Sequence, residues 1–299
     1  MKNQKMNVIE VKNLMKRYGS IQAVNNVTFD VKKNEIFALV GPNGAGKTTT
    51  IEIIEGLRDP DEGSVTINGM APNSDSIKEV IGVQLQNSAF YDKIRVKECL
   101  EMFGGFYRNS ISVTQALEKI DLQKRSNAYY GDLSGGLKQI VAIGIALIGN
   151  PKLLFLDEIS TGLDPQVRRA TWDLIRGIKE EGKTIFITTH YMEEAEKLAD
   201  RVAIIDHGKL IALDTPRNLI RDFGGQSEIV YEGEAIDLPS IPVSLINGKV
   251  IIKTKKPNLV ISKVTAEIAK RGMKVHNLRV ENANLEDVFI NLTGKEMRE

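Results

Sequence analysis

Short apolar segments alternate with helical patterns through the first 225 residues of the chain. An apolar run at 35–41 leads into a glycine-rich loop and then a helical segment at 48–57. Further apolar strands are expected at 152–158, 184–190 and 201–213, with helices between them. Strands that are apolar throughout are typical of a parallel sheet covered by helices on both faces. The pattern therefore predicts an α/β fold with a mainly parallel sheet.

The pattern changes near Gly225. Beyond it come a strand at 228–233, a hairpin at 243–254 with an Asn-Gly turn, and a helix at about 258–271. We therefore expect two domains, residues 7–225 and a small α+β domain over 226–299. Within the first domain, the region from about 88 to 140 has a helical pattern and is expected to form a helical subdomain.

Composition narrows the choice of function only slightly. The 299 residues are 42% hydrophobic and 26% charged, as in ordinary globular proteins, and the net charge of +1 provides no overall field for nucleic acid or an anionic membrane. The single cysteine, Cys99, excludes an internal disulfide, fits the cytosol, and is expected to be a small buried apolar residue. The longest apolar run, 140–149, is shorter than the ~20 residues that cross a bilayer, so a membrane role would require a partner.

A phosphate-binding loop is the strongest chemical signal. The stretch GPNGAGKTT, Gly41 to Thr49, matches G-x-x-x-x-G-K-[ST] and lies between a predicted strand and a predicted helix. Glycines let successive backbone N–H groups converge on phosphate at a helix N-terminus. Lys47 is expected to reach the terminal phosphates, and the Thr48 hydroxyl to bind Mg²⁺. The predicted nucleotide-binding residues here are Gly41, Pro42, Asn43, Gly44, Ala45, Gly46, Lys47, Thr48 and Thr49.

Polar residues at the ends of three other strands suggest the rest of a phosphate site. KLLFLDE ends in Asp157, a natural Mg²⁺ ligand beside such a loop, and Glu158, which could deprotonate a water that attacks the γ-phosphate. His190, at the end of TIFITTH, could hydrogen-bond the γ-phosphate or be purely structural. Gln86 could reach Mg²⁺ or the attacking water, with Gln84 as a rival, and either could be a solvated loop residue.

A second glycine-rich helix start occurs in YGDLSGGLKQ. Ser134, Gly135 and Gly136 precede an apolar helical run and offer a hydroxyl and free backbone N–H groups. The alternative is an N-capping serine with a glycine turn. Asp164, in TGLDP, is equally compatible with a ligand-binding role and with a turn before Pro165.

Taken in order, GPNGAGKTT, LSGGLKQ, LLFLDE, TGLDP and TTH resemble the nucleotide-binding subunit of ATP-binding cassette (ABC) transporters over residues 7–225. The resemblance implies a P-loop NTPase fold and hydrolysis of ATP with Mg²⁺. It assigns these motif positions: Gly41–Thr49 to Walker A, Gln86 to the Q-loop, Ser134–Gln139 to the signature, Asp157 and Glu158 to Walker B, Asp164 to the D-loop and His190 to the switch. It also implies that Tyr18 stacks on adenine and that Val24 supports the same ring.

The family also offers a ligand for the second glycine loop. In ABC proteins the signature loop binds the γ-phosphate of ATP held by the opposite subunit, which implies a head-to-tail homodimer around two ATP molecules. Some positions depart from the family pattern, with Ile140 where arginine is frequent and Ile159 and Ser160 where proline and threonine are usual. Hydrolysis is expected to persist.

The last segment resembles the C-terminal extension of ATPase subunits from bacterial drug and antibiotic-peptide exporters, whose membrane subunits are separate chains. We therefore expect a peripheral protein on the cytoplasmic side of the membrane that drives separate transmembrane permease subunits, with no nucleic acid as partner. The region 88–105 is expected to contact them. Its candidate anchors, which could also be core residues, are Phe90, Tyr91, Met102, Phe103 and Phe106.

Three other functions remain as alternatives. A soluble ABC ATPase acting on nucleic acid or ribosomes would usually carry two cassettes or long insertions, which this chain lacks. A regulatory GTPase would need an N/T-K-x-D motif, and the sequence contains none. A non-enzymatic binding module is supported only by the departures from the family motifs.

Overall fold

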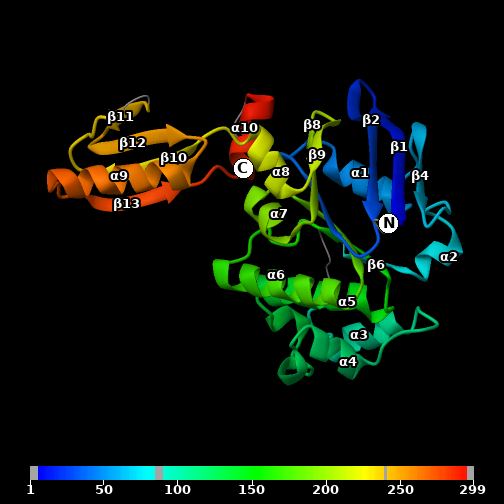
Figure 1. Cartoon of the computed structure of the whole chain (residues 1–299). Helices are drawn as coiled ribbons and strands as arrows, with labels where there is room; N and C mark the ends of the chain where they lie inside the picture. The colour runs from blue at the N-terminus through cyan, green and yellow to red at the C-terminus, as the bar shows by residue number, and fades with distance from the viewer. Residues whose placement is uncertain (1–5, 85–89, 239–240, 295–299) are drawn as a thin grey trace. The chain divides into compact units, whose positions relative to one another are not determined.

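A computed structural model of the chain describes residues 6–84, 90–238 and 241–294. They form two compact units that divide between Pro216 and Arg217 (Figure 1). Among the described residues, the first unit contains two sheets and the second unit one, and each unit has its own hydrophobic core.

The first unit is built on a sheet in which the described strands follow the order β5-β6-β7-β3-β8-β9. Its strands are β3 (Ile36–Val40), β5 (Ile81–Gln84), β6 (Leu153–Asp157), β7 (Thr184–Thr189), β8 (Arg201–Asp206) and β9 (Lys209–Asp214). Neighbouring strands pair in parallel except for β8 and β9, which are antiparallel. Every residue of β3, β6 and β7 is buried. The predicted α/β fold with a mainly parallel sheet is confirmed.

Three helices begin just beyond the carboxyl ends of these strands. The helix α1 (Lys47–Ile54) follows β3, α6 (Pro165–Glu180) follows β6, and α7 (Met192–Leu198) follows β7. The helix α6 begins with Asp164 as its N-cap and Pro165 in its first turn, a combination that satisfies free backbone N–H groups. Loops at this edge of the sheet therefore carry the predicted chemistry, as is usual for open α/β sheets.

A separate antiparallel sheet has the order β2-β1-β4, with β1 (Asn7–Tyr18), β2 (Ile21–Lys32) and β4 (Glu62–Ile67). The first two strands are each 12 residues long. Asn13 (φ 50°) and Asn26 (φ 55°) lie at register shifts, where the chain continues the strand through a bulge. At the turn between these strands, Tyr18 pairs with Ile21 and Arg17 pairs with Gln22.

The helical part of the first unit contains α2 (Asp75–Lys78), α3 (Val96–Gly104), α4 (Val113–Lys119) and α5 (Gly135–Ile148), with single 3₁₀ turns at Gln123–Arg125 and Tyr130–Asp132. The helices α3 and α4 both pack on α5. Gly144 permits this close approach, because a Cβ there would lie 2.7 Å from the Ile120 side chain. Cys99 is fully buried in α3.

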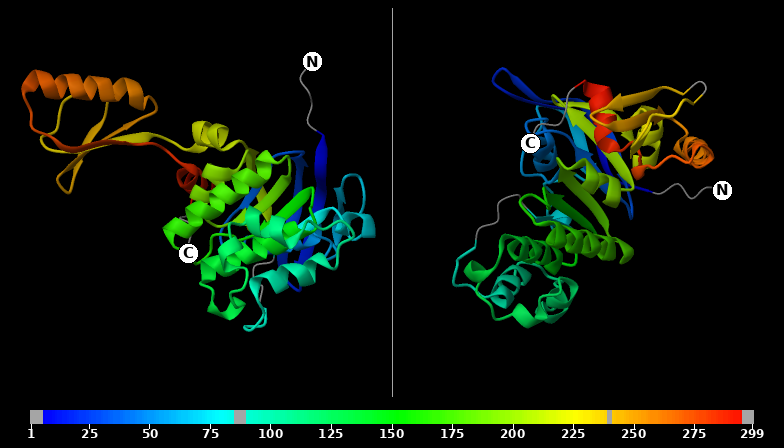
Figure 2. Two further views of the ribbon diagram at one scale, coloured as in Figure 1. Left: turned by 90° about the horizontal axis from the view of Figure 1, so that it is seen from below. Right: turned by 90° about the vertical axis from the view of Figure 1, so that its left-hand side faces the viewer.

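The second unit is the predicted small α+β domain. It consists of α8 (Pro216–Phe223), β10 (Ser227–Glu232), β11 (Val243–Ile246), β12 (Lys249–Thr254), α9 (Pro257–Arg271), β13 (His276–Glu281) and α10 (Leu285–Thr293). The strand order is β11-β12-β10-β13, and α9 lies along one face of this sheet (Figure 2). In the predicted Asn-Gly turn, Asn247 and Gly248 both have positive φ, as a type I′ turn requires.

Candidate nucleotide-binding site

The phosphate loop packs closely against β8 of one sheet and β2 of another. A Cβ on Gly41 would lie 2.2 Å from the Ile205 carbonyl oxygen of β8, and one on Gly46 would lie 2.2 Å from the Ala23 carbonyl oxygen of β2. Gly46 also has a φ of 102°, a conformation that residues with side chains rarely adopt. The loop shape therefore requires glycine at both positions, and its amides lie at the N-terminus of α1.

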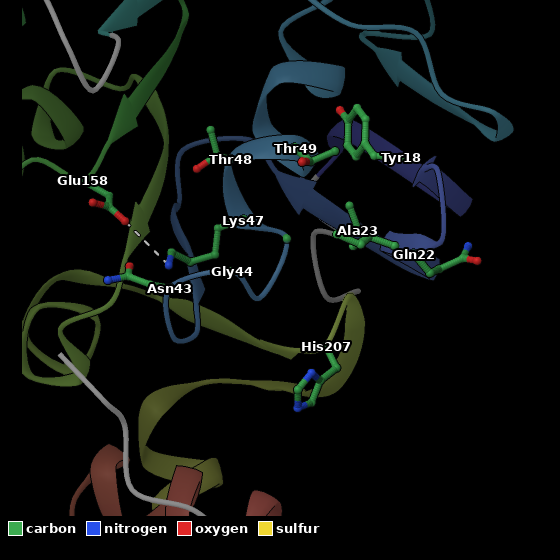
Figure 3. A pocket seen from close by; sticks show the side chains of 12 residues that line it. Tyr18, Gln22, Ala23, Asn43, Gly44, Lys47, Thr48, Thr49, Glu158 and His207 are labelled. Atoms are coloured by element: carbon green, nitrogen blue, oxygen red, sulfur yellow. Dashed lines mark ion pairs between the residues drawn. The ribbon is translucent and has the colours of Figure 1, made fainter.

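Lys47, the first residue of α1, is 4% exposed and points back over the loop. Its Nζ donates hydrogen bonds to the carbonyl oxygens of Gly41 (2.9 Å) and Pro42 (3.1 Å), and lies 3.6 Å from Glu158 Oε1 (Figure 3). Burial lowers the pKa of Lys47, and the Glu158 carboxylate opposes this shift. The ammonium group is thus fixed where an anion above the loop could replace the carbonyl oxygens as its acceptor.

The two acidic residues at the end of β6 are positioned by β7. Asp157 pairs with Thr188 across the parallel strands, and the Thr188 hydroxyl donates a hydrogen bond to Asp157 Oδ1. Burial raises the pKa of Asp157, while this hydrogen bond lowers it. Glu158 adopts a φ of 49°, and its backbone N–H donates to the Thr188 carbonyl oxygen at 3.1 Å. Thr188 is therefore a positioning residue that the sequence analysis did not identify.

His190 completes a cluster drawn from three elements. Its Nδ1 lies 3.5 Å from Glu158 Oε1, the same oxygen that faces Lys47. The ring also packs on Tyr191, with 4.1 Å between the ring centroids. Lys47, Glu158 and His190 were each suggested by a separate motif, and the structure brings their charged or polar ends together.

A cavity of about 400 Å³ opens beside this cluster (Figure 3). It is lined by Tyr18, Ile21, Gln22, Ala23, Asn43, Gly44, Gly46, Lys47, Thr48, Thr49, Glu158 and His207. We call it the phosphate-loop pocket. Tyr18 is 39% exposed, and the Arg58 guanidinium lies over its ring, 5.3 Å from the ring centroid. An exposed aromatic face at one end and a phosphate loop at the other suit a nucleotide.

The sequence did not predict four of the pocket residues, Ile21, Gln22, Ala23 and His207. His207 lies in the tight turn between β8 and β9, where its φ is 46°, and the following Gly208 donates its amide to the Ala45 carbonyl oxygen at 2.9 Å. A His-Gly pair between two apolar runs is a hairpin signal, but its contact with the phosphate loop depends on tertiary structure. Gln22 lines the same pocket, whereas Val24 is fully buried in the core and does not.

The second glycine loop and the turn acid lie outside the phosphate-loop pocket of this chain. Ser134 caps α5, and its hydroxyl accepts a hydrogen bond from the Leu137 amide at 3.4 Å. Gly135 is exposed, whereas a Cβ on Gly136 would lie 2.5 Å from Val167 of α6. Asp164 accepts from the backbone amides of the first turn of α6. Gln86 lies outside the described residues, and its rival Gln84 is 2% exposed at the end of β5.

The oxygen donors near the loop fit Mg²⁺ better than a softer metal. Thr48 offers an exposed hydroxyl and Asp157 a carboxylate, and Mg²⁺ prefers such ligands together with phosphate oxygens and water. Across the part of the chain that the structure describes, no three His, Cys, Asp or Glu side chains form a group that could hold a metal ion by themselves. A metal here would therefore be shared with the phosphates.

Comparison with known proteins gives the family. The family model described as "ABC transporter" matches residues 24–161. The linearmycin resistance ATP-binding protein LnrL of Bacillus subtilis (strain 168) is 33% identical, over 98% of this chain and 100% of the relative. The chain belongs to the ABC transporter family. A Nod factor export ATP-binding protein I from Burkholderia orbicola (strain AU 1054) is 36% identical, over 97% of this chain and 98% of the relative.

Solved structures agree with this assignment. The ABC cassette MJ0796, in a dimeric post-hydrolysis state bound to ADP and phosphate, has a TM-score of 0.62 and 27% identity, with 69% of this chain and 98% of that chain covered. The protein is an ABC-type ATPase with a P-loop NTPase fold, and it binds ATP. Within residues 6–84, 90–238 and 241–294, no helix has the length and apolar character needed to cross a membrane.

A buried polar network occupies the positions where this ABC protein departs from the family pattern after Walker B. Ile159 is fully buried, and the Ser160 hydroxyl donates to Glu194 Oε1 of α7. Trp172 of α6 donates from Nε1 to the same oxygen at 2.9 Å. Burial raises the pKa of Glu194, and these hydrogen bonds lower it. The serine therefore has a structural partner 34 residues away in the chain.

Proposed function

We propose that this ABC ATPase is the nucleotide-binding subunit of an exporter, which works as a head-to-tail homodimer around two ATP molecules and drives separate permease subunits from the cytoplasmic side of a membrane. The observation that carries the proposal is the separation of two phosphate-binding features. Lys47 and Glu158 line the phosphate-loop pocket, whereas Ser134 and Gly135 are exposed at the start of α5 and are not among its lining residues. A second copy could then supply its signature loop to this ATP.

The chain's own residues would share the chemistry as follows. Lys47 binds the β- and γ-phosphates and Tyr18 stacks on the base, while Asp164 lies near the second copy. Glu158 accepts a proton from water as the water oxygen bonds to the γ-phosphorus and the bond to the bridging oxygen breaks, which gives ADP and inorganic phosphate. His190, beside the same carboxylate, orients it and contacts the γ-phosphate. Thr48, Asp157 and Gln86 would hold Mg²⁺, which supplies charge neutralisation at the phosphates.

The membrane subunits are proposed to contact the region 88–105 and its immediate surroundings. Of the candidate anchors in the described residues, Tyr91 (84% exposed), Phe106 (74%) and Met102 (45%) are open to solvent. Phe90 and Phe103 are partly buried and pack edge to face, with ring centroids 5.7 Å apart. Exposed large apolar side chains of this kind favour a protein contact.

The transported compound is proposed to be a drug, an antibiotic or a peptide. The names of the relatives concern linearmycin resistance and Nod factor export. Both names fit an outward direction of transport.

Affinity purification of the tagged chain from solubilised membranes of its own cell tests this function. We expect two copies of the chain to be recovered with permease subunits, and cells that express both to become less sensitive to the exported compound. Recovery with ribosomes or nucleic acid at physiological salt, and without any membrane protein, would contradict the proposal.

A further inference from the structure

The orientation of the His190 ring is not fixed by a normal hydrogen bond at Nδ1. This atom is buried and has no hydrogen-bond partner among the residues that the structure describes. It lies 3.5 Å from Glu158 Oε1, which is longer than an ordinary hydrogen bond. In the proposed function this ring must face both Glu158 and the γ-phosphate, so packing has to hold it in place.

Tyr191, the N-cap residue of α7, supplies that packing. Its ring and the His190 ring have centroids 4.1 Å apart and planes inclined at 42°. The Tyr191 backbone N–H donates a hydrogen bond to the Thr189 hydroxyl oxygen at 2.9 Å, which fixes the backbone on both sides of His190. Aromatic rings in contact stabilise each other beyond the area that they bury. The Tyr191 ring can orient His190, however, only if it is held in place itself.

Arg168 holds the Tyr191 ring from the first turn of α6. Its guanidinium carbon lies over that ring, 5.2 Å from the centroid, which is within the usual range of a cation–π contact. Arg168 Nε is buried without a hydrogen-bond partner in the described part of the chain. The Arg168 backbone N–H donates to the Asp164 carbonyl oxygen at 3.0 Å, at the capped start of the helix. The arginine is therefore fixed to a rigid turn.

A second arginine of α6 also contacts the α7 region, but it lies away from His190 along the chain and in its contacts. Arg176 donates hydrogen bonds to the Lys197 carbonyl oxygen at 3.2 Å and to Asp173 at 2.8 Å. If arginine contacts served only to attach α7 to α6, Arg168 and Arg176 would be equivalent. Arg176 is therefore the matched control for a role of Arg168 at His190.

We propose that Tyr191 and Arg168 are positioning residues for ATP hydrolysis: the Arg168 guanidinium holds the Tyr191 ring, and this ring holds the His190 imidazole beside Glu158. The inference rests on the role of His190 in the proposed function. Neither Tyr191 nor Arg168 lines the phosphate-loop pocket, so both act on the chemical step and not on ATP binding. A small displacement of a group at the reacting centre is enough to slow that step strongly.

Steady-state phosphate release over a range of Mg²⁺-ATP concentrations gives kcat and KM separately. Tyr191→Ala should lower kcat by about 10- to 100-fold and leave KM within about twofold of the wild type. Tyr191→Phe keeps the ring and should keep kcat within about twofold of the wild-type value. Arg168→Leu should lower kcat by about 3- to 10-fold, and Arg168→Lys should recover part of the loss because a cation remains over the ring.

Nuclear magnetic resonance reports the His190 ring without any turnover, dimer or permease. The chain has three histidines, so the imidazole signal of His190 is the one that disappears in His190→Gln. Tyr191→Ala removes the neighbouring ring current and should move this signal, and Arg168→Leu should move it in the same direction by less. The signal should stay in place in Tyr191→Phe and in Arg176→Leu.

A double variant tests whether the two positions act through one ring. Adding Tyr191→Ala to His190→Gln should cost no further activity, because the group that Tyr191 positions is already gone. Arg176→Leu should keep the wild-type kcat.

The inference is overturned if Tyr191→Ala keeps the wild-type kcat, if it changes KM alone, if Arg176→Leu loses as much as Arg168→Leu, or if Tyr191→Ala lowers the activity of His190→Gln further. Those results, with a clear loss in His190→Gln itself, would leave the proposed function standing. If His190→Gln releases phosphate as fast as the wild type, the proposed role of His190 fails and this inference fails with it.

Discussion

Glu158 lies at the centre of the proposed site, because its carboxylate faces both Lys47 and His190. Its Oε1 lies 3.6 Å from Lys47 Nζ and 3.5 Å from His190 Nδ1, and its backbone is held in a left-handed conformation by the Thr188 carbonyl oxygen. A carboxylate placed between a phosphate-binding cation and an imidazole is well suited to accept a proton from water.

We predict that Glu158→Gln retains ATP binding and loses phosphate release by about 10²- to 10⁴-fold, the usual contribution of a positioned base. The isosteric amide keeps the side-chain shape but cannot take up the proton. Steady-state phosphate release with Mg²⁺-ATP measures the loss, and Glu52→Gln is the matched control. Near-normal turnover would remove Glu158 from this role.

Glu55, which caps the C-terminus of α1 and is 6% exposed, gives a second prediction, for stability. Burial, together with the nearby Asp157 and Glu52 carboxylates, raises its folded-state pKa to about 8, above the ordinary value of 4.5. Between about pH 4.5 and pH 8, the folded state therefore keeps the Glu55 proton while the unfolded state loses it. The stability that this group contributes is complete below about pH 4.5 and is lost as the pH rises through about 8. Glutamine carries no such proton.

We therefore expect the free energy of unfolding of Glu55→Gln to increase relative to that of the wild type between about pH 5 and pH 9, by at most about 5 kcal/mol. Urea titrations of both proteins at several pH values measure the difference, in which the contributions of groups that titrate independently of Glu55 cancel. A difference that stays constant across this range would contradict the assigned burial of Glu55.

At the scale of single elements, the sequence was most informative where a strand is apolar throughout. The strands β3, β6 and β7 were predicted because both of their faces are buried, and the phosphate loop because its glycine spacing is specific. The run at 201–213 was expected as one strand, but it forms β8 and β9 around the His207–Gly208 turn. That turn is what places His207 in the pocket.

Other parts of the site could not be found from local patterns. Thr188 contacts Asp157 because parallel strands align the two residues, and Trp172 meets Ser160 and Glu194 only after α6 and α7 have packed. These contacts join positions that are distant in sequence, and the residue types involved also occur at many positions that make no such contact. Local periodicity carries no information about them.

The hydrogen bonds that Ser160 and Trp172 donate to Glu194 connect α6 with α7 and should contribute to stability. Trp172→Phe removes the Nε1 donor to Glu194, which is fully buried, so the free energy of unfolding should fall by about 1–3 kcal/mol for the lost donor, with a further loss for the volume that the smaller ring leaves unfilled. Ser160→Ala should have a similar effect, and the double variant should lose less than the two single losses combined, because both donors share one acceptor oxygen. Urea unfolding measures all three, and strict additivity would contradict a shared network.

For the whole molecule, the two compact units divide at Pro216 and Arg217, whereas the sequence pattern changes near Gly225. The helix α8 lies between these positions, and the Asn291 side chain of α10 donates a hydrogen bond to the Phe223 carbonyl oxygen at 2.9 Å. The change in the sequence pattern comes just before β10, whereas the division in space comes at the start of α8. All residues of the phosphate-loop pocket, and Ser134, belong to the first unit.

The central claim at this scale is that each ATP is bound by two copies of the chain, one through Lys47 and the other through Ser134. Ser134→Arg places a bulky cation at the start of α5 without touching the phosphate-loop pocket, so each monomer should still bind ATP. Only the contact between copies is expected to be lost.

Light scattering of Glu158→Gln with Mg²⁺-ATP, with and without the added Ser134→Arg change, tests this claim most directly. The account predicts a particle of twice the monomer mass for Glu158→Gln with ATP, and a monomer that still binds ATP when Ser134→Arg is added. An ATP-dependent dimer that forms equally well with Ser134→Arg would contradict it.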